Sequence, residues 1–184
     1  MRIIRGTHQR RLIIAPDNLP VRPTTDMAKE SLFNILENQL DFEDTTALDL
    51  FAGTGNISYE LASRGCQRVT AVDDNNNCVR FIRETALKLN MPQISVVRSD
   101  VFRFLPKHAM KYDIVFADPP YECEHYDLLV EAVFEQKLLK ENGIFVLEHD
   151  KRKDYSTHPH FYDHRNYGKV NFSFFSAERT ENND

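Results

Sequence analysis

The sequence predicts an α/β fold, in which a mostly parallel sheet is covered by helices on both faces. Short apolar runs alternate with longer stretches of helical periodicity along almost the whole chain. Each apolar run is short and nearly continuous, which is typical of parallel strands buried on both faces. The 184 residues contain no repeat or obvious linker, and a chain of this length can bury one core, so we expect a single domain.

The expected elements follow in chain order. Residues 2–5 and 10–14 predict a short hairpin around a turn at 6–8. Thr24 or Thr25 can cap a helix over 26–39, because a threonine oxygen accepts a hydrogen bond from the first helical turn. The other strands are expected at 46–50, 68–72, 94–98, 113–117, 143–148 and 170–175, the last of them antiparallel beside 143–148. The other helices are expected near 57–63, 79–89 and 126–135.

The charge of the chain is distributed unevenly. The net charge of −5 is unfavourable for a protein that envelops nucleic acid, yet residues 1–30 carry six basic side chains against three acidic ones. A local positive surface is enough to contact phosphates. The basic N-terminus is therefore either a nucleic-acid contact or a solvated face, and charge alone leaves both open.

Cysteine usage and the N-terminus indicate the compartment. The three cysteines show no paired spacing, and the N-terminus lacks the long apolar core of a signal peptide, so we expect a reduced, cytoplasmic protein. His158, His160 and His164 lack the ligand spacing of a metal site, and no metal is expected. A monomer is the default expectation.

Acidic residues follow four of the predicted strands. Asp49, Asp73, Asp100 and Asp118 lie at or just beyond the carboxyl ends of successive strands. In an open α/β sheet the ligand crevice lies at this edge, so the four carboxylates converge there. They would repel phosphates but suit S-adenosylmethionine, which carries a sulfonium, an ammonium, ribose hydroxyls and an adenine amine.

A glycine-rich turn follows the first of these strands. Residues 53–58 begin like a dinucleotide-binding fingerprint but lack its third glycine, and no Gly-Lys-Ser/Thr follows, which excludes an NTP-binding P-loop. On this turn alone a nicotinamide enzyme stays possible. The glycines can let the backbone approach the methionine end of the cofactor, and Asp73 can accept both ribose hydroxyls.

The tetrapeptide Asp118-Pro119-Pro120-Tyr121 is the most informative motif. The Asp118 carboxylate and the Pro119 carbonyl can both accept hydrogen bonds from an exocyclic amine. The prolines fix the backbone and Tyr121 can stack on the ring that bears the amine. If the amine lies on the Watson–Crick edge of a nucleic-acid base, that base must be unpaired or flipped out. The motif predicts an amino-group methyltransferase.

With these residues in place, the chain resembles the bacterial small-subunit ribosomal RNA guanine-N2 methyltransferases of the RsmD type. The resemblance rests on residues 1–4, on Arg22-Pro23-Thr24-Thr25-Asp26 leading into residues 29–36, and on residues 49–55 and 118–121. It implies a Rossmann-like class I methyltransferase with a seven-stranded sheet and one antiparallel strand near the C-terminus. It further implies that residues 1–184 form one domain, with a basic hairpin extension at 1–25 and the catalytic core at 26–184.

The resemblance also assigns residues. Binding of S-adenosylmethionine, and of the product S-adenosylhomocysteine, falls to Arg22, Pro23, Thr24, Asp49, Phe51, Ala52, Gly53, Thr54, Gly55, Asn56, Asp73, Asp74, Asp100, Val101 and Phe102. Contacts with ribosomal RNA, expected within a ribosomal particle, fall to Arg2, Arg5, Arg10, Arg11 and Lys29. The chain departs from the family in that members often have glycine at position 10 and arginine at positions 27 and 29.

Two alternatives are kept. A methyltransferase acting on another amine, such as DNA adenine N6, is disfavoured because the chain has no inserted target-recognition domain to read duplex sequence. A non-catalytic RNA-binding module that holds S-adenosylmethionine as a structural ligand is disfavoured because it would not need residues 118–121.

Overall fold

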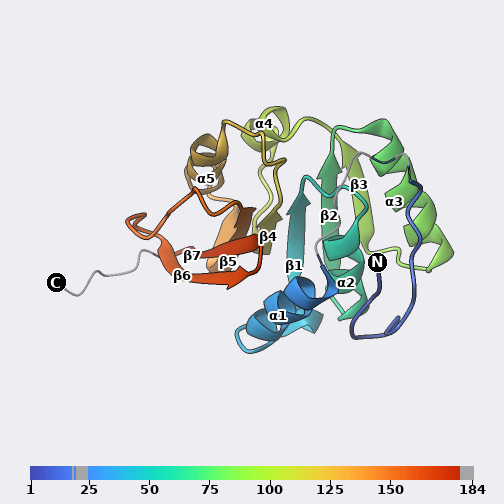
Figure 1. Ribbon diagram of the computed structural model, residues 1–184. Coiled ribbons are helices and arrows are strands. Elements are labelled where there is room, and N and C mark those ends of the chain that lie inside the picture. The colour runs from blue at the N-terminus through green and yellow to red at the C-terminus, as the bar shows by residue number, and fades with distance from the viewer. Residues whose placement is uncertain (18, 20–24, 179–184) are drawn as a thin grey trace.

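The computed structural model describes residues 1–17, 19 and 25–178, which form an α/β fold around one seven-stranded sheet (Figure 1). The strands are β1 Thr46–Leu50, β2 Arg68–Asp73, β3 Ile94–Arg98, β4 Tyr112–Ala117, β5 Leu139–His149, β6 Phe161–Tyr167 and β7 Val170–Ser176. The helices are α1 Asp26–Glu37, α2 Asn56–Ser63, α3 Asn76–Lys88, α4 Val101–Phe104 and α5 Tyr126–Glu135, with short 3-10 turns at Phe42–Asp44 and Leu105–Lys107. No helix in this part of the chain is long and apolar enough to span a membrane.

The strand order is β3-β2-β1-β4-β5-β7-β6, and β7 runs antiparallel to both of its neighbours. The predicted single antiparallel strand near the C-terminus is therefore confirmed. Strands β1 to β5 are parallel where they pair, with Asp49 beside Phe116 and Phe116 beside Val146. This register brings the carboxyl ends of β1, β4 and β5 together at one edge of the sheet.

Helices cover the two faces of the sheet. On one face α1, α2 and α3 share a core with Phe116 and Val146. On the other, α4 and α5 share a core with Val115 and Leu147. Successive residues of a strand point to opposite faces, so each of these strands contributes to both cores. This is why their sequences are apolar runs rather than alternating patterns.

Helix α1 begins where the sequence predicts. The side chain of Thr25 accepts a hydrogen bond from the backbone N–H of Ala28 at 3.2 Å, which satisfies one of the free donors of the first turn. The helix ends at Glu37, earlier than the predicted 39. Leu32, Phe33 and Leu36 are buried against the sheet, as their spacing along one helical side requires.

The N-terminal hairpin differs from expectation. The chain reverses as predicted, but residues 2–5 and 10–14 form only one isolated antiparallel bridge, between Arg2 and Leu12. The N–H groups of Ile4 and Arg5 donate to the Glu60 carboxylate of α2 instead of to the returning chain. Residues 1–14, the N-terminal arm, are thus fastened to the helical layer, and Ile3 and Ile13 belong to the core beneath it.

Besides the short helix α4, strand β6 is an element that the sequence did not define. Its central residues Asp163, His164 and Arg165 are polar, and the strand pairs only with β7, at the edge of the sheet. An edge strand with a solvated face carries no apolar run to mark it. Strand β5 is likewise longer than the predicted 143–148, because its first residues at Lys140 and Glu141 are polar.

Candidate active site

Three of the four predicted carboxylates gather at the carboxyl edge of the sheet. Asp49 and Asp73 are buried near the ends of β1 and β2, and Asp118 lies half-buried just after β4. Asp100 differs from them, because it is exposed and accepts a hydrogen bond from the N–H of Arg103 at 2.9 Å, which caps α4. Its predicted part in binding adenine stays a prediction.

The glycine-rich turn is built from left-handed residues. Phe51, Gly53 and Gly55 have φ angles of 59°, 55° and 79°. The N–H of Gly53 donates to Asp73 at 2.8 Å, which ties the turn to the end of β2. At Gly55 a Cβ atom would lie 2.8 Å from the ring of Tyr59, so this glycine is also required by packing inside the protein.

Asp49 is held by a residue that the sequence analysis missed. Ser58, on the first turn of α2, donates its hydroxyl proton to the Asp49 carboxylate at 2.5 Å. Burial raises the pKa of Asp49 to about 7; the Ser58 hydrogen bond opposes this and the nearby Asp73 charge adds to it. Ser58 could have been found from the sequence, because it lies in the glycine-rich segment 53–58 at the start of a predicted helix.

Asp73 keeps room for a ligand. It accepts hydrogen bonds from the N–H of Gly53 at 2.8 Å and of Asn75 at 2.9 Å, one on each carboxylate oxygen. Each oxygen has a second lone pair, so two hydroxyls can still be accepted. Burial is the main reason that the pKa of Asp73 is raised. The following residue, Asp74, is exposed.

Aromatic rings pack against one another beside the glycine-rich turn. Phe51 meets Phe102 edge-on with ring centroids 6.3 Å apart, and Phe102 meets His125 edge-on at 5.7 Å. His125, which directly precedes α5, was not among the predicted site residues. Val101 was, but its side chain is buried in the core under α4, so only its backbone can face a ligand.

The motif at 118–121 is fixed from both sides. The N–H of Asp118 donates to the Leu50 carbonyl at 3.3 Å, which ties it to the end of β1. The hydroxyl of Tyr126 lies 3.4 Å from the Pro119 carbonyl and 3.5 Å from that of Pro120. The Pro119 oxygen therefore has one protein donor and one lone pair left for an amine. Tyr126 was missed, although it lies five residues after Tyr121 at the start of a predicted helix.

A further buried carboxylate, Glu148, lies at the end of β5 beside this motif. The pKa of Asp118 is raised well above its usual value, first by burial and then by the negative charges of Glu148 and Asp49. Strand 143–148 was predicted to end at Glu148, so the rule that placed the other four carboxylates could have found it.

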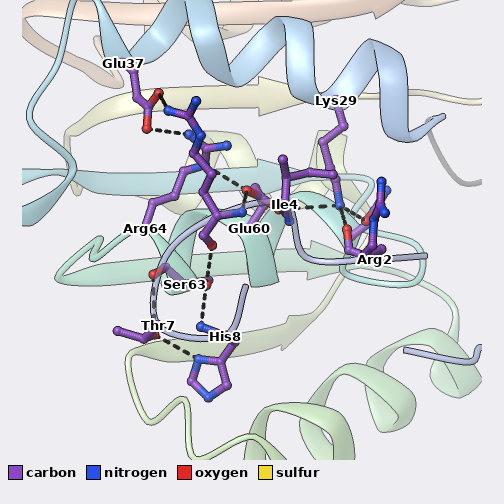
Figure 2. A network of polar contacts seen from close by, with 11 residues as sticks. Arg2, Ile4, Thr7, His8, Lys29, Glu37, Glu60, Ser63 and Arg64 are labelled. Carbon is purple, nitrogen blue, oxygen red and sulfur yellow. Dashed lines mark hydrogen bonds and ion pairs between the residues drawn. The ribbon is translucent and has the colours of Figure 1, made fainter. Parts of the chain in front are cut away.

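Lys29 corrects the predicted RNA contacts. Figure 2 shows its amine pointing inward between the N-terminal arm and α2. The amine donates to the Arg2 carbonyl at 2.6 Å and to Asn56 Oδ1 at 2.7 Å, and lies 3.6 Å from Glu60. Its side chain is fully buried, so it cannot touch a phosphate. Lys29 is an internal cation that holds the arm, α1 and the start of α2 together.

The four predicted arginines are exposed on the arm. Arg2 lies 3.5 Å from Asp26 and Arg5 lies 2.7 Å from Glu37, whereas no salt bridge within residues 1–17, 19 and 25–178 involves Arg10 or Arg11. Arg10 has a φ angle of 66°, the left-handed region that glycine favours. Glycine, which the resemblance implies at position 10, would adopt this conformation without strain.

Two further predicted residues lie under the arm. Thr54 is buried with its hydroxyl 3.5 Å from the sulfur of Met1, and Asn56 receives the Lys29 hydrogen bond. Thr54 thus links the glycine-rich turn to the arm directly, and Asn56 links it to the arm through Lys29. Arg22, Pro23 and Thr24 lie outside the described residues.

The residues at this edge of the sheet suit S-adenosylmethionine. The turn contains left-handed residues, Phe51 and Phe102 are aromatic, and Asp49, Asp73 and Asp118 are carboxylates, which suit hydroxyls and cations and would repel phosphates. The fold and this site together define a class I S-adenosylmethionine-dependent methyltransferase.

Comparison with known proteins agrees with this class. The family model described as "Conserved hypothetical protein 95" matches residues 1–176, and the chain belongs to this family. The ribosomal RNA small subunit methyltransferase D of Escherichia coli is 33% identical over 143 residues, which cover 78% of this chain and 68% of that protein. Its namesake in Haemophilus influenzae is 29% identical over 157 residues, covering 83% and 80%.

A solved structure supports the fold. The 16S rRNA N2 G1207 methyltransferase of Thermus thermophilus, in complex with AdoMet and guanosine, superposes with a TM-score of 0.71. The match covers 87% of this chain and 45% of that one at 20% identity, so it speaks for the shared architecture alone.

Proposed function

We propose that the protein transfers a methyl group from S-adenosylmethionine to the exocyclic N2 amine of a guanine in small-subunit ribosomal RNA. One observation carries the proposal: Asp118 and the Pro119 carbonyl, both acceptors, stand at the strand ends beside the cofactor turn. The relatives named as ribosomal RNA small subunit methyltransferases support the RNA substrate, and the Thermus protein of similar fold acts on a guanine N2.

The residues of the chain contribute mainly by positioning. When bound, the cofactor supplies an electrophilic methyl group. The guanine N2 lone pair is delocalised and a poor nucleophile, so Asp118 and Pro119 orient the amine and stabilise the positive charge that develops on it. Tyr121, which is half-buried, would stack on the base, and Tyr126 keeps the Pro119 carbonyl in place. Holding both reactants in line can lower the barrier by about 7–11 kcal/mol.

The substrate is tested by methyl transfer from labelled S-adenosylmethionine to unmodified small subunits, protein-free small-subunit rRNA and duplex DNA. We expect N2-methylguanine in the ribosomal samples and faster initial rates on the particle, since a small enzyme has little surface with which to read naked RNA. Label in DNA adenine would move the protein to another amine methyltransferase class. Cofactor binding without transfer to any substrate would favour a binding module.

We further propose that Arg10 and Arg11 contact RNA phosphates. Arg10→Gly and Arg11→Ala are each expected to lower the slope of log affinity against log salt concentration by about 0.7–0.9, the contribution of one phosphate contact. Arg10→Gly also removes a left-handed arginine, so its stability is expected to stay equal or rise. Filter binding over a salt series measures the slope.

Arg165→Ala is the matched control for these variants, because Arg165 is an exposed arginine on β6, at the other edge of the sheet. It is expected to leave the slope unchanged. An equal reduction of the salt slope in all three variants would show that the arm is not the RNA contact.

A further inference from the structure

Three carboxylates lie at the carboxyl ends of the neighbouring strands β1, β4 and β5. Phe116 on β4 and Val146 on β5 are paired in the parallel register and belong to the core under α1, α2 and α3. Two residues further on, Glu148 lies on the same face of β5, because side chains alternate with a period of two. Asp118 occupies the matching position just past the end of β4. On β1, Ala47 belongs to that core and Asp49 follows it by two residues.

Two of these carboxylates are almost fully buried, and Asp118 is half-buried. Glu148 is 4% exposed and Asp49 is 1% exposed. The charged and titratable groups that face Asp118 are Asp49 from β1, Glu148 from β5 and the Tyr126 hydroxyl from α5. None of the salt bridges found in the described part of the chain involves Asp118. Its neighbours therefore disfavour its charge, and a proton is bound readily.

Building on the proposed function, we propose that Asp118 takes the proton that the amine loses, and that Glu148 is the positioning residue whose charge keeps Asp118 ready to accept it. In this step the amine nitrogen forms a bond to the methyl carbon as the carbon–sulfur bond breaks. One N–H bond of the amine then breaks, and its proton forms an O–H bond on the Asp118 carboxylate. The bonding pair left on nitrogen restores the neutral base.

The charges of the site balance in this scheme. The reactants together carry one positive charge on the sulfonium and one negative charge on Asp118; the products are a neutral thioether and a protonated, neutral Asp118. No uncompensated charge is created in the crevice, where an unpaired charge is costly. A negative charge on Glu148 makes proton uptake by Asp118 more favourable, since like charges at short distance disfavour double ionisation.

The pH dependence of single-turnover methyl transfer tests the proposal in the wild type, Glu148→Gln and Glu148→Asp. Asp118 must be ionised to act, so the rate is expected to rise with pH through an elevated pKa. Removing the Glu148 charge lowers that pKa, and the rise in Glu148→Gln should move to lower pH by about one unit or more. Its plateau should fall, because Asp118 becomes a weaker base.

Glu148→Asp keeps the negative charge on a side chain that is one methylene shorter. Its methyl-transfer rate is therefore expected to rise at a pH between those of the wild type and Glu148→Gln. It also serves as the test variant if Glu148→Gln does not fold, as judged by circular dichroism and cofactor affinity. If Glu148 acted only in folding, its variants would change thermal stability or cofactor affinity, and the pH at which the methyl-transfer rate rises would stay the same.

Equal apparent pKa values in the wild type and the variants, or a flat wild-type profile, would overturn the proposal. The proposed function can fail separately. If the methyl group is recovered on an amine other than guanine N2, the function is wrong, yet the same pH comparison still decides the role of Glu148, because every such amine must lose a proton.

Discussion

Asp118→Ala is expected to lower the rate of methyl transfer by about 10³-fold, because it removes the acceptor that orients the amine and stabilises its developing charge. Asp118 is anchored through its backbone to Leu50, so the loop itself should keep its place. Cofactor affinity is therefore expected to change only a few-fold. Single-turnover transfer to the ribosomal substrate and calorimetric titration with S-adenosylmethionine measure the two effects.

Glu122→Ala is the matched control for this variant. Glu122 is an exposed carboxylate one residue beyond the motif, and its loss is expected to leave the rate unchanged. A folded Asp118→Ala protein with wild-type rate would show that the residue is a turn former and no part of the reaction. A loss of equal size in both variants would point instead to damage of the loop.

Lys29→Met is expected to lower the free energy of unfolding by about 3 kcal/mol or more, the range found when one partner of a buried ion pair is removed. Glu60 would stay fully buried with Arg64 as its cation, while the Arg2 carbonyl and Asn56 would lose their donor. The expected loss lies at the lower end because Arg64 remains. Urea unfolding followed by circular dichroism measures it.

Arg2→Met provides the comparison for the buried lysine. Arg2 and Asp26 form an exposed pair at 3.5 Å, with side chains 52% and 43% exposed. Such pairs contribute about 0–1 kcal/mol. A Lys29 variant no less stable than the Arg2 variant would mean that the buried network contributes little, and that the arm is held by its apolar residues Ile3 and Ile13 instead.

The sequence was most informative where the chain is buried on both sides. The parallel strands and a threonine cap at Thr24 or Thr25 could be predicted, because apolar runs and helix starts are local signals, and the structure shows the cap to be Thr25. The carboxylates at the strand ends followed from the fold class. Strand β6 could not be predicted in this way, since an edge strand with polar residues has no apolar run and exists only through its pairing with β7.

The site was predictable in position and less so in detail. Lys29 was assigned to RNA because a lysine near other basic residues is usually exposed, and its burial depends on Glu60, thirty-one residues away in the chain. Four other residues come next to predicted site residues only through folding of the chain: Ser58, His125, Tyr126 and Glu148. A rule based on strand ends could have found Glu148, whereas the others depend on loop geometry.

The row of buried carboxylates bears on how the protein releases its spent cofactor. Coulomb attraction acts on a sulfonium and not on the neutral thioether that remains after the methyl group has left. Two molecules of nearly the same shape are therefore distinguished by a single charge, and we expect the crevice to hold the spent form less firmly than the fresh one. We therefore expect the acidic residues that prepare the reaction also to limit inhibition by accumulated product.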